Sequence, residues 1–183
     1  TGLPGNVAIE REFARRARDG HPSCMMYVDL DNFKVYNDVY GFSQGDRVIL
    51  LTARCLREAL AREGAPGDFI GHVGGDDFVV IAAPEATDAI AEAAVALFAA
   101  EVPSLYTPED RQRGRIRGKD RDGRGREFPL ITLSIGILEC LFETHVTFED
   151  LSHRVASVKK LAKAQAGNSV IRDRRAPLGA AAR

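Results

Sequence analysis

The sequence predicts an α/β (α+β) protein in which helices flank a central mixed sheet. Segments with helical spacing of apolar residues alternate with short β-rich segments, an order typical of crossovers between parallel strands. One pair of β-rich segments, 68–73 and 77–83, is joined directly by Gly74-Gly75. That pair indicates a tight hairpin, because glycine readily adopts positive φ angles. A sheet that contains both crossovers and a hairpin must have parallel and antiparallel strands.

Each expected element has a local signal. A helix over 7–19 follows from Ile9, Phe13 and Ala17, which recur on roughly one face, with Asn6 as a suitable N-cap. The segment 24–30 is rich in apolar and β-forming residues and reads as a buried strand. The other expected elements are helices at 32–37 and 44–63, the two hairpin strands, an alanine-rich helix at 86–101, a strand at 128–140, a helix at 148–166 and a last strand at 168–172.

Length and composition bound the domain and its surroundings. The chain has 183 residues, 45% of them hydrophobic, which suits one domain with a real core. We expect that domain at 1–175, followed by a tail at 176–183. The net charge of −1 argues against bulk attraction to nucleic acid or to an anionic membrane.

The cellular setting is predicted to be the cytoplasm. Cys24, Cys55 and Cys140 are odd in number and lack metal-ligand spacing, which indicates a reducing compartment. No apolar run approaches membrane-spanning length, and no signal peptide is recognisable. The chain opens at Thr1 on a loop without a start methionine. We therefore expect a fragment of a longer protein, free or membrane-attached, that lacks a sensor, partner domain or anchor.

The segment 106–127 is rich in arginine, diluted by acidic residues, and reads as a charged hairpin turning at Asp122-Gly123. It is either a solvated protrusion that guards a sheet edge or a contact for an anionic ligand or partner domain. It lacks interleaved aromatic residues, which disfavours single-stranded nucleic acid, and we expect no nucleic-acid partner.

Carboxylates follow two of the expected strands. Asp29 and Asp31 lie at the end of the strand at 24–30, and Asp76 and Asp77 lie at the glycine turn. If these strands pair, the acids converge on one point, where they can hold Mg²⁺, a cation that prefers carboxylate and phosphate oxygens. Any one of these acids is otherwise simply solvated, as acids at turns usually are. A glycine turn beside a magnesium site indicates binding of a nucleoside triphosphate.

The chain resembles the GGDEF family over nearly its whole length. The resemblance rests on motifs in family order: Thr-Gly-Leu-Pro at 1–4, Val-Asp-Leu-Asp-Asn-Phe-Lys-Val-Tyr-Asn-Asp-Val-Tyr-Gly at 28–41, Gly-Asp at 45–46, Gly-Gly-Asp-Asp-Phe at 74–78 and Thr-Leu-Ser-Ile-Gly at 132–136. It implies a fold akin to nucleotidyl cyclases and polymerase palms. It also implies diguanylate cyclase activity, in which two GTP give cyclic di-GMP and two pyrophosphates. Each subunit would hold one GTP, so a second GGDEF domain must face the first in a homodimer.

The resemblance also implies roles for particular residues. Asp29, Asp76 and Asp77 would bind Mg²⁺ or Mn²⁺ with the Leu30 carbonyl, and Asp77 would also activate the ribose 3′-hydroxyl. Asn37 and Asp46 would read guanine, Phe33, Lys34 and Lys163 would lie by the phosphates, and Gly74 and Gly75 would border the substrate. A carboxylate such as Asp46 can accept from both N1–H and the exocyclic amine of guanine, a pair that adenine lacks. The alternatives are a helix N-terminal acid for Asp46 and a solvated helix lysine for Lys163.

Departures from the family pattern concern phosphate binding and activation. The signature's fourth residue is Asp77 in place of Glu, which withdraws the carboxylate by roughly 1.5 Å. A misplacement of about 1 Å at a catalytic group can cost on the order of 100-fold in rate. The other departures are His72 and Gly167 in place of arginines, Lys160 in place of tyrosine, Phe42 in place of histidine, and Ala65 in place of the arginine of the inhibitory product site. With that arginine absent, we expect no ordinary product inhibition through 65–68.

Two hypotheses fit this pattern. The chain is a weakened diguanylate cyclase, or it is a GTP-binding regulatory module that controls a neighbour such as an EAL-type cyclic di-GMP phosphodiesterase. We favour the cyclase, because every carboxylate of the pattern is retained as an acid. A pure dimerisation module is disfavoured, since it would not need Asn37, Asp46, Asp29 and Asp76 together.

Overall fold

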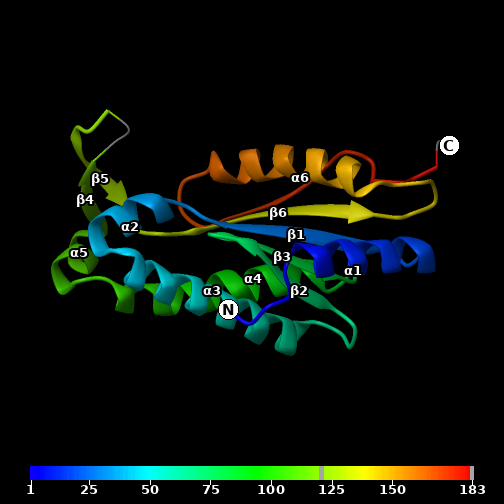
Figure 1. Ribbon diagram of the computed structural model, residues 1–183, viewed down its shortest axis with the longest axis horizontal. Helices are drawn as coiled ribbons and strands as arrows, with labels where there is room; N and C mark the ends of the chain where they lie inside the picture. The colour runs from blue at the N-terminus through cyan, green and yellow to red at the C-terminus, as the bar shows by residue number, and fades with distance from the viewer. Residues whose placement is uncertain (120–121, 182–183) are drawn as a thin grey trace.

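The computed structural model describes residues 1–119 and 122–181, and its centre is a five-stranded sheet (Figure 1). The strand order is β2-β3-β1-β6-β7. β6 and β7 run parallel, and the other neighbours run antiparallel, which confirms the predicted mixed sheet. The strands are β1 (Ser23–Leu30), β2 (Phe69–Gly74), β3 (Asp77–Ala82), β6 (Leu133–Cys140) and β7 (Ser169–Arg172).

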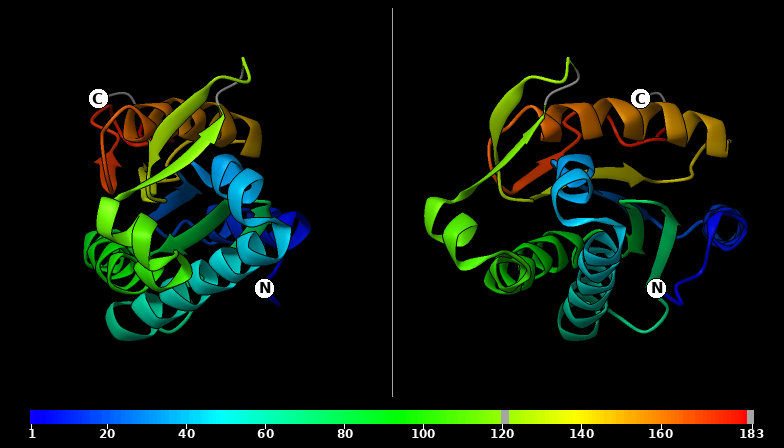
Figure 2. Two further views of the ribbon diagram at one scale, coloured as in Figure 1. Left: turned by 90° about the vertical axis from the view of Figure 1, so that its left-hand side faces the viewer. Right: turned by 60° about the vertical axis from the view of Figure 1, so that its left-hand side comes forward.

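Helices cover both faces of the sheet, as Figures 1 and 2 show from three directions. On one face α6 packs on β6 and β7, while α1 packs on β2 and meets α6. On the other face α3 packs along α4, and α2 packs on α3. The helices are α1 (Asn6–Asp19), α2 (Phe33–Tyr40), α3 (Phe42–Glu63), α4 (Thr87–Glu101) and α6 (Phe148–Lys163).

The alternation of side chains along the central strands separates two hydrophobic cores. In β1, Met25 contributes to the core beneath α1 and α6, whereas Met26 and Val28 contribute to the larger core above α3 and α4. In β3, Val79 belongs to the first core and Val80 to the second. Because side chains alternate with a period of two, Asp29 and Asp77 fall on the α6 side of the sheet.

Most expected elements shift by one to three residues at an end, and two predictions at element boundaries are wrong in kind. Asn6 is the first residue of α1 rather than its cap, and Gly5 takes the cap position without a side-chain hydrogen bond. The single strand expected at 128–140 is two strands, because β5 (Gly125–Pro129) belongs to a separate hairpin and β6 begins at Leu133. Proline has no N–H to donate and so tends to end such pairing.

The charged segment forms a two-stranded hairpin beside α2. β4 (Arg115–Lys119) pairs antiparallel with β5, and the hairpin projects away from the body of the protein (Figure 1). The expected turn at Asp122-Gly123 adjoins positions 120 and 121, which lie outside the described residues. Two short elements that were not predicted from the sequence precede β4. They are a 3₁₀ turn, η1 (Val102–Leu105), and a helix, α5 (Pro108–Arg113).

All three cysteines are buried and free. In the part of the chain that the structure describes, no helix is both long enough and apolar enough to cross a membrane.

Candidate functional site

The strand register brings two of the predicted acids, Asp29 and Asp77, together at one end of the sheet. Asp29 and Asp77 are directly opposite one another in the β1–β3 ladder. Asp76 lies in the β2–β3 turn, half-buried. Gly74 and Gly75 in this turn have φ angles of 146° and 56°, which side chains rarely tolerate. The glycines permit the turn, and the alternation of side chains along β1 and β3 places the acidic pair on the face that α6 covers.

Two lysines of α6 reach this acidic pair. Lys159 Nζ lies 2.6 Å from Asp29 Oδ2 and 2.6 Å from Asp77 Oδ1. Lys163 Nζ lies 2.5 Å from Asp29 Oδ1. The Asp29 side chain is only 3% exposed, so its charge is compensated almost entirely by these two ammonium groups. The four side chains form a compact cluster without net charge, which we call the Asp–Lys cluster.

The cluster shifts the protonation equilibria of its members in different directions. Burial alone would raise the pKa of Asp29, but hydrogen bonds from Lys159 and Lys163 outweigh it and lower the pKa. Burial raises the pKa of Asp77, and the adjacent Asp29 carboxylate adds to that effect. Burial would lower the pKa of Lys159, yet its hydrogen bonds to both carboxylates raise it. Lys159 is thus held as an ammonium ion between the two acids.

Asp31 stands apart from the Asp–Lys cluster. Its Oδ2 accepts hydrogen bonds from Thr132 Oγ1 at 3.0 Å and Ser134 Oγ at 2.7 Å. Burial raises the pKa of this carboxyl. Asp31 therefore ties the end of β1 to β6 through hydroxyl groups.

Among the described residues, the site offers a cation two adjacent carboxylates, those of Asp29 and Asp77. Within residues 1–119 and 122–181, no three or more His, Cys, Asp or Glu side chains are grouped to hold a metal ion. The position between Asp29 and Asp77 nevertheless attracts a cation, since the Lys159 ammonium lies within hydrogen-bond distance of an oxygen from each. Carboxylate oxygens are also the ligands that Mg²⁺ prefers. Leu30 turns its side chain into the opposite core, so only its backbone could serve this site.

A second group of predicted residues lies where α2 meets α3. The Asn37 Oδ1 atom is buried and has no hydrogen-bond partner among the described residues. A β-carbon placed on Gly45 would lie 1.8 Å from this oxygen, so a larger residue at position 45 would displace the Asn37 side chain. Asp46 follows on α3 and is exposed. An unpaired buried carbonyl beside an exposed carboxylate is suited to a ligand that offers hydrogen-bond donors.

The residues expected by the phosphates are dispersed. Phe33 is buried at the start of α2. Lys34 is largely exposed and lies 3.8 Å from Asp38 on the same helix. Lys163 is in the Asp–Lys cluster, as described above. The structure thus places Lys163 on a predicted metal ligand, a role that sequence reasoning did not assign to it.

His72, which replaces an arginine of the family pattern, braces the glycine turn. Its ring stacks on Phe78 at 4.5 Å between centroids, and its Nε2 lies 3.0 Å from the Gly75 carbonyl oxygen. Its Nδ1 lies 3.3 Å from Thr1 Oγ1. The histidine at this position thus makes short contacts that support the glycine turn.

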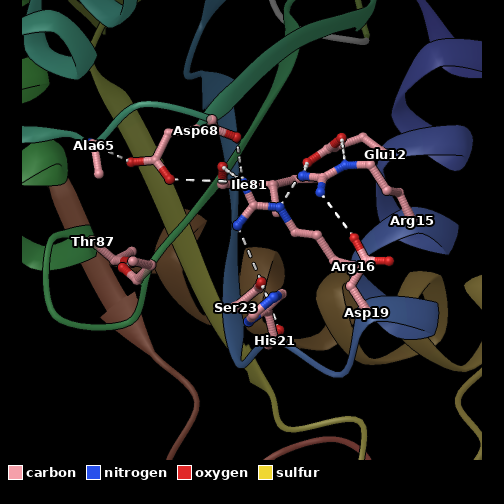
Figure 3. A network of polar contacts seen from close by, with 12 residues as sticks. Glu12, Arg15, Arg16, Asp19, His21, Ser23, Ala65, Asp68, Ile81 and Thr87 are labelled. Carbon is pink, nitrogen blue, oxygen red and sulfur yellow. Dashed lines mark hydrogen bonds and ion pairs between the residues drawn. The ribbon is translucent and has the colours of Figure 1, made fainter.

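Asp68, which remains from the inhibitory product pattern, is already engaged (Figure 3). Its Oδ2 accepts from the Ala65 backbone N–H at 2.8 Å, and its Oδ1 lies 3.7 Å from the buried Arg16 guanidinium. Arg16 also donates to Glu12, Ser23 and the Gly67 carbonyl. This network fastens α1 to the start of β2.

Lys159 is the member of the site that sequence reasoning missed. The available signal was its spacing, because Lys159 and Lys163 are four residues apart and share one face of α6. Like charges at that spacing repel one another slightly. Such a pair facing a sheet indicates negative charge on the other side.

Comparison with known proteins identifies the family. The model of the family described as "Diguanylate cyclase, GGDEF domain" matches residues 1–115. The chain belongs to the GGDEF family. Its described structure aligns with the GGDEF domain of YfiN (TpbB) from Pseudomonas aeruginosa at a TM-score of 0.66 and 27% identity, covering 93% of this chain and 96% of that one. The GGDEF domain of DgcB from Caulobacter crescentus, solved in complex with cyclic di-GMP, aligns at 0.62 and 25% identity, covering 94% and 92%.

Curated relatives of this GGDEF domain are much longer proteins. Diguanylate cyclase DgcP of Pseudomonas aeruginosa is 41% identical over 85 residues, which is 44% of this chain and 12% of DgcP. Diguanylate cyclase DosC of Escherichia coli is 27% identical over 163 residues, 88% of this chain and 31% of DosC. The chain thus spans under a third of either relative, and it is a diguanylate cyclase-type domain of cyclic di-GMP signalling.

Proposed function

We propose that this domain condenses two GTP into cyclic di-GMP and two pyrophosphates, with weakened activity. The observation that supports this most is the convergence of Asp29 and Asp77 in the β1–β3 register beside the glycine turn. The retained acids lie at the end of the sheet where α2 begins, and a helix N-terminus favours the negative charge of phosphate.

Guanine recognition is assigned to the junction of α2 and α3. The unpaired Asn37 Oδ1 accepts a hydrogen bond from the base, and the exposed Asp46 carboxylate accepts from its N1–H and exocyclic amine. Adenine presents no such pair of donors on that edge, so the same two residues would select GTP over ATP. Phe33 and Lys34, at the start of α2, border the phosphates.

Asp29, Asp76 and Asp77, with the Leu30 carbonyl, are the groups that would hold Mg²⁺ or Mn²⁺. When bound, the metal neutralises triphosphate charge and lowers the pKa of an attacking hydroxyl. The chain's own contribution is to fix Asp29 and Asp77 opposite one another on adjacent strands, with Asp76 in the turn that precedes Asp77. Asp77 also orients the ribose 3′-hydroxyl, and its short arm is the reason for the proposed weakness.

The assembly around this domain is also proposed. Two copies would face one another, each with one GTP, because the two half-reactions join two nucleotides. A sensor or an EAL-type domain would adjoin the domain at 1–175 in the full protein, in the cytoplasm.

A second candidate is a GTP-binding module that regulates such a neighbour without turnover. The engagement of both Asp29 and Asp77 by Lys159 favours it, because a bridging ammonium opposes metal loading. Similarity to a phosphodiesterase also supports this candidate. Cyclic di-GMP phosphodiesterase PdeB of Shewanella oneidensis is 29% identical over 92 residues, which is 50% of this chain and 10% of PdeB.

The substitution Asp77→Glu separates the two candidates. Measured as cyclic di-GMP formed per minute at saturating GTP and Mg²⁺, turnover should rise about tenfold or more, because the carboxylate regains its reach. Asp88→Glu adds the same methylene to an exposed acid of α4 and should change nothing. If Asp77→Glu binds GTP but shows no more turnover than the parent domain, the regulatory module is the better account.

A further inference from the structure

The ammonium group of Lys159 lies where a cation shared by Asp29 and Asp77 would lie. Its Nζ is 2.6 Å from one oxygen of each carboxylate. These are the two side chains that face each other across the β1–β3 ladder. A metal ion held by these two carboxylates would take the place of the Lys159 ammonium between them, so the two cations would compete for the pair.

Several contacts hold Lys159 in this position. Its side chain is 22% exposed, and its Nζ also lies 4.7 Å from the centre of the Tyr27 ring, within range of a cation–π interaction. Its contacts with an oxygen of each carboxylate hold the side chain from two sides. A freely solvated lysine would have none of these partners.

We propose that Lys159 is a built-in counter-cation that competes with the divalent metal for Asp29 and Asp77, and so raises the metal concentration at which this domain loads. The inference rests on the proposed function only in taking these two acids as metal ligands. It assigns a regulatory role to a residue of α6 that lies outside every motif of the chain.

Electrostatics makes the competition obligatory. Two positive charges a few ångströms apart repel strongly in a half-buried site, where the effective dielectric constant is far below that of water. The metal can therefore bind only after the ammonium leaves. A hollow of about 370 Å³, lined by Tyr27, Val73, Val155 and Lys159 among others, adjoins the site and gives the side chain room to move.

The loss of Lys159 from the acids also has a cost for the protein without metal. Asp29 is nearly buried, and without Lys159 its remaining charge partner among the described residues is Lys163. The neutral variant should therefore be less stable than the parent domain until a metal replaces the missing charge. This dependence provides a readout that is independent of catalysis.

The test is a titration of the nucleotide-free domain with Mn²⁺, in which electron paramagnetic resonance measures the concentration of unbound Mn²⁺. We expect Lys159→Met to bind Mn²⁺ at least tenfold more tightly than the parent domain. Lys160→Met removes an equal charge from an exposed neighbour and should change the affinity less than twofold. Equal or weaker Mn²⁺ binding by Lys159→Met would overturn the proposal.

A second measurement covers the possibility that Lys159→Met is unstable. Lys159→Gln removes the charge but retains an amide donor, and a ligand that binds the folded state raises its melting temperature. Saturating Mn²⁺ should raise the Tm of this variant more than that of the parent domain, and an equal rise would contradict the inference. Tighter Mn²⁺ binding in a domain that forms no cyclic di-GMP would leave the inference standing while the proposed function fails.

Discussion

Gly45→Ala should separate guanine recognition from folding. An added β-carbon would lie 1.8 Å from Asn37 Oδ1 and 2.8 Å from Asn37 Cγ, so the Asn37 side chain must rotate away. Alanine favours a helix interior over glycine by about 1 kcal/mol, while an off-rotamer side chain costs about 0.5–1.5 kcal/mol. These contributions nearly cancel, and the variant should melt within a few degrees of the parent domain.

The effect on nucleotide binding should be larger. Rotation of Asn37 removes one hydrogen bond to the base, worth about 0.5–1.5 kcal/mol, and the new methyl group narrows the space beside it. We therefore expect GTP affinity to fall about tenfold, since every 1.4 kcal/mol is a factor of ten. Titration with a fluorescent GTP analogue measures this affinity. The control is Ser43→Ala, at an exposed position of the same helix, which should leave the affinity unchanged. Unchanged GTP affinity in Gly45→Ala would refute the assignment of Asn37.

Three further substitutions test other parts of the account. Asp46→Ala should abolish the preference for GTP over ATP in a competition assay, and a retained preference would remove Asp46 from guanine reading. Asp76→Asn should abolish Mg²⁺-dependent GTP binding or turnover, and unaltered behaviour would disprove its role as a metal ligand. Asp173→Asn should lower the free energy of unfolding at pH 7 by about 1–2 kcal/mol, because hydrogen bonds from Arg175 and Arg154 outweigh burial and lower the pKa of Asp173 to about 2 from 3.8. The stability that the Asp173 carboxylate contributes is present above pH 3.8 and is lost as the pH falls through about 2. The unfolding free energies of Asp173→Asn and the parent domain, measured with denaturant, should therefore converge near pH 2. A difference that stays constant with pH would contradict the pairing of Asp173 with these arginines.

The part of the site that depends on strand pairing could be predicted from sequence. The Gly74-Gly75 signal correctly predicts the β2–β3 hairpin, and the acids beside it follow from where the strands end. The turn itself is centred on Gly75 and Asp76, one residue later than the glycine pair, because Gly74 still pairs with Asp77. Local chemistry therefore predicted the element, and the ladder register decided which acid faces which.

The part that depends on packing between distant segments could not be predicted. Lys159 reaches Asp29 and Asp77 only because α6 packs over the ends of β1 and β3. The residue pattern within 148–166 does not indicate which acids a lysine of this helix will contact. The engagement of Asp68 by Arg16 likewise joins α1 to a residue far along the chain. The Tyr106 hydroxyl accepts from the Ile131 N–H at 2.7 Å in the gap between β5 and β6, where one long strand was expected.

The most direct test of the account is product analysis by mass spectrometry after incubating the concentrated domain with GTP and Mg²⁺. High concentration is needed because two half-sites must meet. The account predicts cyclic di-GMP, or its linear intermediate, at a low rate. Intact GTP in a sample shown to bind it would contradict the account and favour the regulatory module.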